Sequence, residues 1–224
     1  MITTELVFVR HGEARCNTAG IVGGPRTCTG LTNVGHEQAD KAARRLAAEH
    51  GGAPFAALYA GPRMRLQQTG QVLATALGLP LLTEAGLDGP AHGQADGRPW
   101  AEVKTAFGGG PHVYPDRLWA SGSDTWNGYL RRATDFLAVL IDRHDGERVL
   151  LAAHGETILA AHALLLGPAS EAGFTIEHAS LTRWQRHRNR FGQHRWMLER
   201  HNDTAHLMSA ASLRCSRDSG HTAR

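Results

Sequence analysis

Leu6-Val-Phe-Val-Arg-His-Gly-Glu13 joins a short apolar run to an abrupt polar ending. Four consecutive apolar residues are typical of a strand that is covered on both faces. A second run of this kind, Arg148-Val-Leu-Leu-Ala-Ala153, is also followed by a histidine and a glycine, His154-Gly155. Ligands of open α/β sheets bind at the carboxyl ends of the strands. We therefore expect His11 and His154 to meet at that edge of a sheet.

The rest of the chain alternates strand-like and helix-like segments. Further strands are expected at 55–59, 79–82, 174–176, 181–184 and 193–198, and helices at 32–49, 62–77, 125–144 and 157–166. This alternation predicts an α/β fold, a three-layer α/β/α sandwich with a mainly parallel central sheet. We expect one domain over residues 1–208, with a loop or lid insertion at about 86–123 that is mostly loop. Residues 209–224 are expected to form a frayed tail.

The composition excludes several classes of protein. The chain has 224 residues, of which 42% are hydrophobic and 20% charged, so it can bury a full core and is not expected to be disordered. The net charge of +3 is small. Basic residues gather at 183–200, where interleaved apolar side chains favour a hairpin with a charged outer face over a nucleic-acid-binding surface. We expect no nucleic-acid partner, and homo-oligomerisation stays open.

The sequence also predicts where the protein works. No run of 18 apolar residues occurs, and the first residues lack the features of a signal peptide. The three cysteines are widely spaced and form neither a zinc motif nor a disulfide framework. A cytoplasmic protein without a membrane segment is therefore expected.

Two imidazoles at the carboxyl edge of the sheet, together with arginines nearby, would form a pocket for a phosphate dianion. Arginine has a planar guanidinium that matches phosphate oxygens, and charge-assisted hydrogen bonds of this type are strong. The sequence therefore predicts a small phosphorylated ligand.

Four motifs in a fixed order point to a known family. They are Arg10-His-Gly-Glu13, Leu31-Thr-x-x-Gly-x-x-Gln-Ala39, Arg65-x-x-Gln-Thr69 and His154-Gly-Glu-Thr-Ile158. With these motifs the chain resembles the histidine phosphatase superfamily, which is also called phosphoglycerate-mutase-like. The resemblance spans most of residues 5–207, and it implies the sandwich fold and an activity on phosphate monoesters.

The resemblance also implies roles for individual residues. His11 would be the nucleophile that attacks phosphorus and forms a phosphohistidine. Arg10, Arg65 and His154 would bind the transferring phosphoryl group and stabilise its oxygens. Arg63, two residues before Arg65, is expected to face solvent. No metal and no cofactor is implied, because the arginines supply the positive charge. Further phosphate-binding residues would be Asn17, Gly23, Gly24 and Gly155.

One position departs from the family pattern. The usual proton donor is a glutamate, and Gly89 stands in its place within the frame from Leu87 to Gly97. General acid catalysis is worth about 10²- to 10⁴-fold in rate. One explanation is that the acid was replaced in an altered form of the protein, and another is that catalysis has drifted. The third is a substitute acid, for which the candidates are Asp88 first and then His92, Asp96 and Glu156.

The sequence thus predicts a phosphomonoesterase that hydrolyses a small phosphorylated metabolite through phosphorylated His11. The loop from Gly89 to Ser123 does not match the segment with which phosphoglycerate mutases enclose their substrate, and this favours the phosphatase branch of the family. The alternatives are a phosphomutase, a catalytically weakened protein that binds a phosphate ligand, and a pathway enzyme whose reaction is not hydrolysis.

Overall fold

The computed structural model describes residues 1–167 and 173–208, and its centre is a six-stranded sheet with the order β3-β2-β4-β1-β5-β6. Strands β3, β2, β4 and β1 are parallel, and β5 and β6 follow as an antiparallel hairpin on the β1 side. The mainly parallel sheet of the sequence prediction is confirmed. The strands span β1 Ile2–Arg10, β2 Ala57–Ala60, β3 Leu81–Thr83, β4 Arg148–Ala153, β5 Leu181–Arg188 and β6 His194–Asp203.

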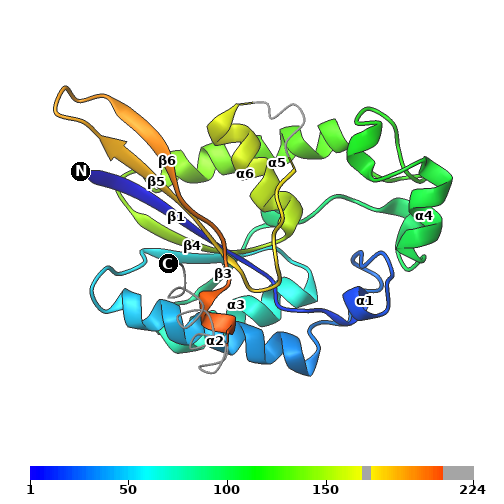
Figure 1. Ribbon diagram of the computed structural model, residues 1–224, viewed down its shortest axis with the longest axis horizontal. Coiled ribbons are helices and arrows are strands. Elements are labelled where there is room, and N and C mark those ends of the chain that lie inside the picture. Colours follow the sequence, from blue (N-terminus) through cyan, green and yellow to red (C-terminus); the bar gives the residue numbers. More distant parts are fainter. Residues whose placement is uncertain (168–172, 209–224) are drawn as a thin grey trace, which may run out of the picture.

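Helices cover both faces of the sheet, which makes three layers (Figure 1). Helices α2 (Asn33–His50) and α3 (Met64–Leu77) pack on one face, and α5 (Trp126–Arg143) and α6 (Gly155–Leu166) pack on the other. The alternation of side chains along β1 explains this division. Val7 and Val9 point to the core beneath α2 and α3, whereas Leu6 and Phe8 point to the core beneath α5 and α6.

The central strands end side by side at one edge of the sheet. Strands β1 and β4 are neighbours, and their last residues, Arg10 and Ala153, are partners in the register. The backbone N–H of His11 then donates to the carbonyl oxygen of Ala153 at 3.0 Å. The chain therefore leaves both strands at the same height, which brings His11 next to His154 as predicted.

The segment at 86–123 is mostly loop, as predicted, but it also contains elements that the sequence prediction did not place. They are the helix α4 (Trp100–Phe107), two short 3₁₀ turns and the end of a third. The segment builds a small core of its own, because apolar side chains of α4 and the loops around it meet residues from the loop after β1. The members of this core are Val22, Ala95, Val103, Phe107 and Trp119.

Two further predictions differ from the structure. Helix α3 begins at Met64, not at Pro62, because Arg63 has extended backbone angles and stands at the N-cap position. Residues 174–176 are not a strand, since their carbonyl groups accept from side chains instead of a neighbouring strand. The predicted tail at 209–224 lies outside the described residues. Within the described ranges, no helix is long and apolar enough to cross a membrane.

Candidate active site

The two motif histidines form the centre of the site. The rings of His11 and His154 are 5.4 Å apart between centroids and nearly perpendicular, at 77°. His11 is 3% exposed and His154 is 1% exposed. Both therefore lie in a medium where charge is costly and hydrogen bonds are strong.

The loop that carries His11 is held by the other motifs of the sequence. The N–H of Gly12 donates to Oγ1 of Thr69 at 3.2 Å, and the N–H of Glu13 donates to Oε1 of Gln38 at 2.9 Å. A Cβ added at Gly12 would lie 2.2 Å from the carbonyl oxygen of Gly35, so the backbones of the loop and α2 touch directly. The motif glycines are thus needed for close backbone approach, which fixes the position of His11.

The hydrogen bonds of His11 define its tautomer. Its Nδ1 lies 2.8 Å from the carbonyl oxygen of Gly12 and donates to it, which leaves the lone pair on Nε2. Burial lowers the pKa of His11 well below its ordinary value, and the nearby charges of Arg65, His154 and Arg10 act in the same direction. At neutral pH His11 is therefore an uncharged imidazole with a nucleophilic Nε2.

Arg65 connects the two histidines. Its Nε donates to Nε2 of His11 at 3.2 Å, and its Nη2 donates to Nδ1 of His154 at 3.3 Å. Its Nη1 donates to the carbonyl oxygen of Gly23 at 2.8 Å. The guanidinium thus lies between the two histidines, directly in front of Nε2 of His11, and brings positive charge to the inner side of the site.

Arg10 is anchored by the segment that precedes β5. Its Nη1 donates to the carbonyl oxygen of Ile176, and its Nη2 donates to Nε2 of His178 at 3.2 Å. Its Nε is buried and has no hydrogen-bond partner among the described residues. Because a buried donor without a partner is costly, this N–H is a ready contact for an anion.

Arg63 belongs to the site, so the expectation that it faces solvent is wrong. It is 4% exposed, and its Nη2 donates to the carbonyl oxygen of Pro90 at 2.7 Å. Its Nη1 lies 3.3 Å from the carbonyl oxygen of Gly23. The extended backbone at Arg63 explains the error, because it turns this side chain to the same side as Arg65.

Asp88 is also brought to the site, as predicted. Its Oδ1 lies 2.7 Å from Nε of Arg63, an ion pair whose angle is not that of a hydrogen bond. The same oxygen accepts from the N–H of Gly89 at 2.9 Å and lies 3.5 Å from Nε2 of His154. Asp88 therefore holds Arg63 and faces the proton-bearing nitrogen of His154.

Gly89 occupies a position that points into the site. A Cβ added there would lie 3.0 Å from Cδ2 of His154 and 3.3 Å from Nη1 of Arg63. A side chain at this position would extend between those two groups. Position 89 therefore lies where the glutamate of the family pattern would reach the site, although glycine provides no side chain there.

The predicted phosphate-binding residues have different positions. Asn17 and Gly23 line the same small cavity as His11, and Gly155 is the first residue of α6. The amide of Gly24 instead donates to Oδ1 of Asp96 at 2.9 Å, so it is already engaged. Gly23 contributes its carbonyl oxygen, which accepts from both Arg63 and Arg65.

Two adjoining cavities form the site. The inner one, of about 60 Å³, is lined by both predicted arginines, His11, Arg63 and Glu156. The outer one, of about 510 Å³, shares Arg63 and His92 with it and is lined by Asp88, Gly89 and further charged residues. A phosphoryl group fits the scale of the inner cavity, and a larger substituent fits the outer cavity.

Sequence reasoning did not identify His178 as a residue of the site. Its ring lies 5.6 Å from that of His11, and burial lowers its pKa to about 4 with the help of the Arg10 charge. The sequence gives His178 no motif, and it lies between two predicted strands. The available signal was its place shortly before β5, the strand that pairs with β1. Among the residues that the structure describes, no cluster of three or more potential metal ligands occurs.

A family profile described as "Histidine phosphatase superfamily (branch 1)" matches residues 6–204 of the chain. The chain is 28% identical to the metal-independent phosphoserine phosphatase of Arabidopsis thaliana over 218 residues, which cover 94% of this chain and 86% of that protein. It is 27% identical to a 2,3-bisphosphoglycerate-dependent phosphoglycerate mutase of Thermoplasma acidophilum over 178 residues, or 79% of this chain and 84% of the mutase.

The fold is also similar to solved structures. A mycobacterial glucosyl-3-phosphoglycerate phosphatase in complex with VO3 superposes with a TM-score of 0.72 at 25% identity. The superposition covers 89% of this chain and 99% of that structure. The similarity of fold therefore extends over most of this chain and nearly all of that structure.

Proposed function

Because the chain belongs to the histidine phosphatase superfamily, we propose that it hydrolyses small phosphate monoesters through a phosphohistidine at His11. One observation carries the proposal. His11 is an uncharged imidazole whose Nδ1–H is fixed on the carbonyl oxygen of Gly12, while its Nε2 lone pair faces the guanidinium of Arg65 in the inner cavity. A nucleophile, positive charge and a pocket of phosphoryl size are thus placed together.

In the first step, Nε2 of His11 attacks phosphorus and the alcohol leaves. Arg65 exchanges its bond to His11 for bonds to the phosphoryl oxygens, and the free Nε of Arg10 donates to another of these oxygens. His154 adds a hydrogen bond, and Asn17 lines the same cavity. In the second step, water attacks the phosphohistidine and releases phosphate. Such catalysis consists mainly of positioning and charge stabilisation.

The leaving group of the substrate would occupy the outer cavity. This cavity adjoins the reacting centre at Arg63 and His92 and has room for a small metabolite. Its lining includes both arginines and aspartates, which suits a polar substituent. The names of the relatives support this class of substrate, since one dephosphorylates phosphoserine and another glucosyl-3-phosphoglycerate.

Hydrolysis is favoured over a mutase reaction by the charge of the outer cavity. A mutase needs a second phosphate site next to the first. The outer cavity has three arginines, and three aspartates among the same lining residues balance them: Arg26, Arg63 and Arg132 against Asp88, Asp96 and Asp124. A second dianion would gain little there, whereas a neutral or zwitterionic group is accommodated.

The test is phosphate release from a panel of phosphate monoesters, with His11→Ala and a matched control, His112→Ala, at an exposed histidine. We expect turnover in the wild-type protein and in the control, and loss of turnover in His11→Ala. Rapid quenching with a ³²P-labelled ester should trap an acid-labile, base-stable phosphoprotein that His11→Ala does not form. Binding of esters without turnover in the wild-type protein would contradict the proposal and would favour the phosphate-ligand-binding alternative.

A further inference from the structure

The absence of a side chain at Gly89 leaves the proposed reaction without its expected proton donor. A Cβ at this position would face His154 and Arg63, so an acid there would reach the site, but glycine has no proton to give. An alkoxide is a poor leaving group unless it is protonated as it departs. Some other group of this chain must therefore supply the proton if alkyl esters are substrates.

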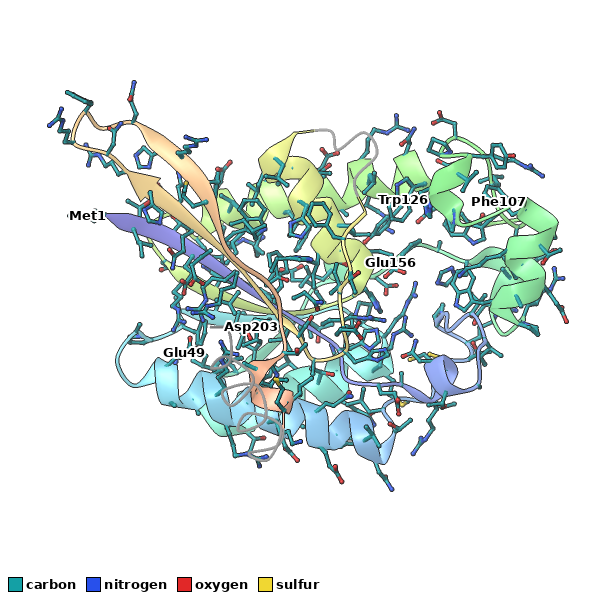
Figure 2. The ribbon with its side chains drawn as sticks, in the orientation of Figure 1. Met1, Glu49, Phe107, Trp126, Glu156 and Asp203 are labelled. Carbon is teal, nitrogen blue, oxygen red and sulfur yellow. The ribbon has the colours of Figure 1, made fainter. Side chains whose placement is uncertain are left out.

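Glu156 lies on the inner cavity, beside the nucleophile. It follows His154 by two residues and sits in the first turn of α6, on the side of the molecule that carries α1 (Arg15–Thr18) and α4 (Figure 2). The described residues that line the inner cavity include three arginines and one carboxylate, which is Glu156. Burial lowers the pKa of Arg10, and the negative charge of Glu156 is the largest opposing influence on it, as expected for groups that face each other.

The carboxylate of Glu156 is free to react. In the described part of the chain it takes part in no ion pair and accepts no hydrogen bond, although its side chain is only partly exposed. A carboxylate beside cations would usually be held by one of them. Its freedom distinguishes it from the other three acids or bases near the site.

Asp88 is committed to its neighbours. Its Oδ1 faces Nε of Arg63 at 2.7 Å and also accepts from the N–H of Gly89. The side chain lines the outer cavity and does not line the inner one. Its contacts are those of a residue that orients Arg63 and His154.

Asp96 and His92 are committed as well. Asp96 accepts from the amides of Gly24 and Arg26 and from the hydroxyl of Thr27, which closes the loop after β1. His92 accepts from Arg63 at 3.3 Å, and burial together with the Arg63 charge lowers its pKa to about 4. His92 is therefore an uncharged imidazole at neutral pH, and the imidazolium form that could donate a proton is scarcely populated.

We propose that Glu156 is the general acid and base of this enzyme and takes over the task of the residue missing at Gly89. The inference rests on the proposed phosphohistidine route. It depends on the position of Glu156 in the inner cavity, on the absence of a described partner, and on the engagement of the three other candidates.

The proton transfers balance over the two steps. As the bond between Nε2 of His11 and phosphorus forms, the bond to the leaving oxygen breaks, and that oxygen takes the proton of the Glu156 carboxyl group. In the second step, the oxygen of a water molecule bonds to phosphorus and gives a proton back to the Glu156 carboxylate. The bond to Nε2 then breaks, and its electron pair returns to His11.

The experiment compares kcat/KM for two esters that differ in their need for a proton. The leaving group of p-nitrophenyl phosphate is stable as an anion, whereas a primary alkyl phosphate such as O-phosphoserine must be protonated. We expect Glu156→Gln to lower kcat/KM about 10²- to 10⁴-fold for the alkyl ester and less than about tenfold for the aryl ester. The matched control is Glu102→Gln, at an exposed glutamate of α4, which should change neither value.

Each outcome decides the inference. An equal loss for both esters in a folded Glu156→Gln protein would overturn it, because a residue that only shapes the site affects both reactions alike. If Glu156→Gln does not fold, Glu156→Asp serves instead and should show a smaller loss with the same bias toward the alkyl ester. A wild-type protein inactive toward both esters would overturn the proposed function itself, and the assignment of Glu156 with it.

Discussion

Nε of Arg65 donates a hydrogen bond of 3.2 Å to Nε2 of His11, the nitrogen that would attack phosphorus. The guanidinium thus covers the lone pair on Nε2 of His11. In the proposed reaction, a substrate would replace this bond with bonds between Arg65 and its own phosphoryl oxygens. The same guanidinium also donates to His154, so movement of Arg65 changes the hydrogen bonding of both histidines.

This arrangement predicts that lysine cannot replace Arg65. A lysine ammonium cannot donate to His11, His154 and Gly23 in the fixed directions of a planar guanidinium. Loss of one preorganised donor at a developing charge costs about 10²- to 10³-fold in kcat, and we expect a loss of this size in kcat/KM for Arg65→Lys. The control is Arg44→Lys on the exposed face of α2. A loss below about fivefold in Arg65→Lys would contradict the role assigned to the guanidinium.

The centre of the fold and of the site could be read from the sequence because it depends on local patterns. The apolar runs before His11 and His154 define two parallel strands, and parallel strands that are neighbours must end at the same edge. The motif around Arg65 lies in a helix start that packs directly beneath this edge. These residues are close together for topological reasons, so no knowledge of distant contacts was needed.

The parts that could not be predicted depend on contacts between distant segments. Arg63 was misassigned because its direction follows from an extended residue before α3 rather than from helical spacing. His178 reaches Arg10 from a segment 168 residues further along the chain. Helix α4 was overlooked among glycines and prolines, although Trp100, Val103 and Phe107 have helical spacing. Val103 and Phe107 belong to the small core, and Trp100 packs against it.

The pair of Arg63 and Asp88 predicts a stability effect that is separate from proton transfer. The Arg63 side chain is 2% exposed and that of Asp88 is 26% exposed. Removing one partner of a buried pair costs about 3–5 kcal/mol, and the partial exposure of Asp88 reduces the expected cost of Asp88→Asn to about 2–3 kcal/mol. Urea unfolding measures this value, and Glu102→Gln at the exposed pair with Arg98 should cost less than about 1 kcal/mol.

Activity of the same variant separates Asp88 from Glu156. If Asp88 orients Arg63 and His154, Asp88→Asn lowers kcat/KM for aryl and alkyl esters by the same factor. A loss confined to the alkyl ester would identify Asp88 as the proton donor, which was the first candidate of the sequence analysis, and would count against Glu156.

Gly35 predicts a second stability effect, located where α2 meets the loop of His11. A Cβ at this position would lie 2.0 Å from the carbonyl oxygen of Glu13, and this backbone cannot move without moving His11. We expect Gly35→Ala to cost about 1–3 kcal/mol and to lower activity in the protein that stays folded. Gly51→Ala is the control, because Gly51 has helical backbone angles and open space around its Cβ. It should be neutral or stabilising by about 0.4–1 kcal/mol, and similar losses in both variants would refute the explanation.

The buried histidines predict that the protein loses stability on mild acidification. Burial is the first cause in each case, and it keeps these side chains uncharged in the native state, whereas in the unfolded chain they titrate at about 6.5. As the pH falls below about 6.5, the unfolded state binds protons that the native state does not bind, so the free energy of unfolding falls. The pKa is lowered to about 4 for His92, His162 and His178, and well below the ordinary value for His11 and His154.

Urea unfolding at pH 7.5 and pH 5.5 measures this effect. The two pH values isolate the histidines, because carboxylates with a lowered pKa, such as Glu49 and Asp96, lose their contribution to stability only at lower pH. Each buried histidine lowers the free energy of unfolding by up to about 1.4 kcal/mol per pH unit in this window. His162→Gln removes one such group far from the substrate, where Trp184 donates to its Nδ1 at 3.2 Å. This variant should be less stable than the wild type at pH 7.5 but should lose less stability between the two pH values. His112→Gln, at an exposed histidine, should show the same difference in the free energy of unfolding between the two pH values as the wild type. If the wild-type protein is equally stable at both pH values, the buried histidines become protonated without cost and the explanation is wrong.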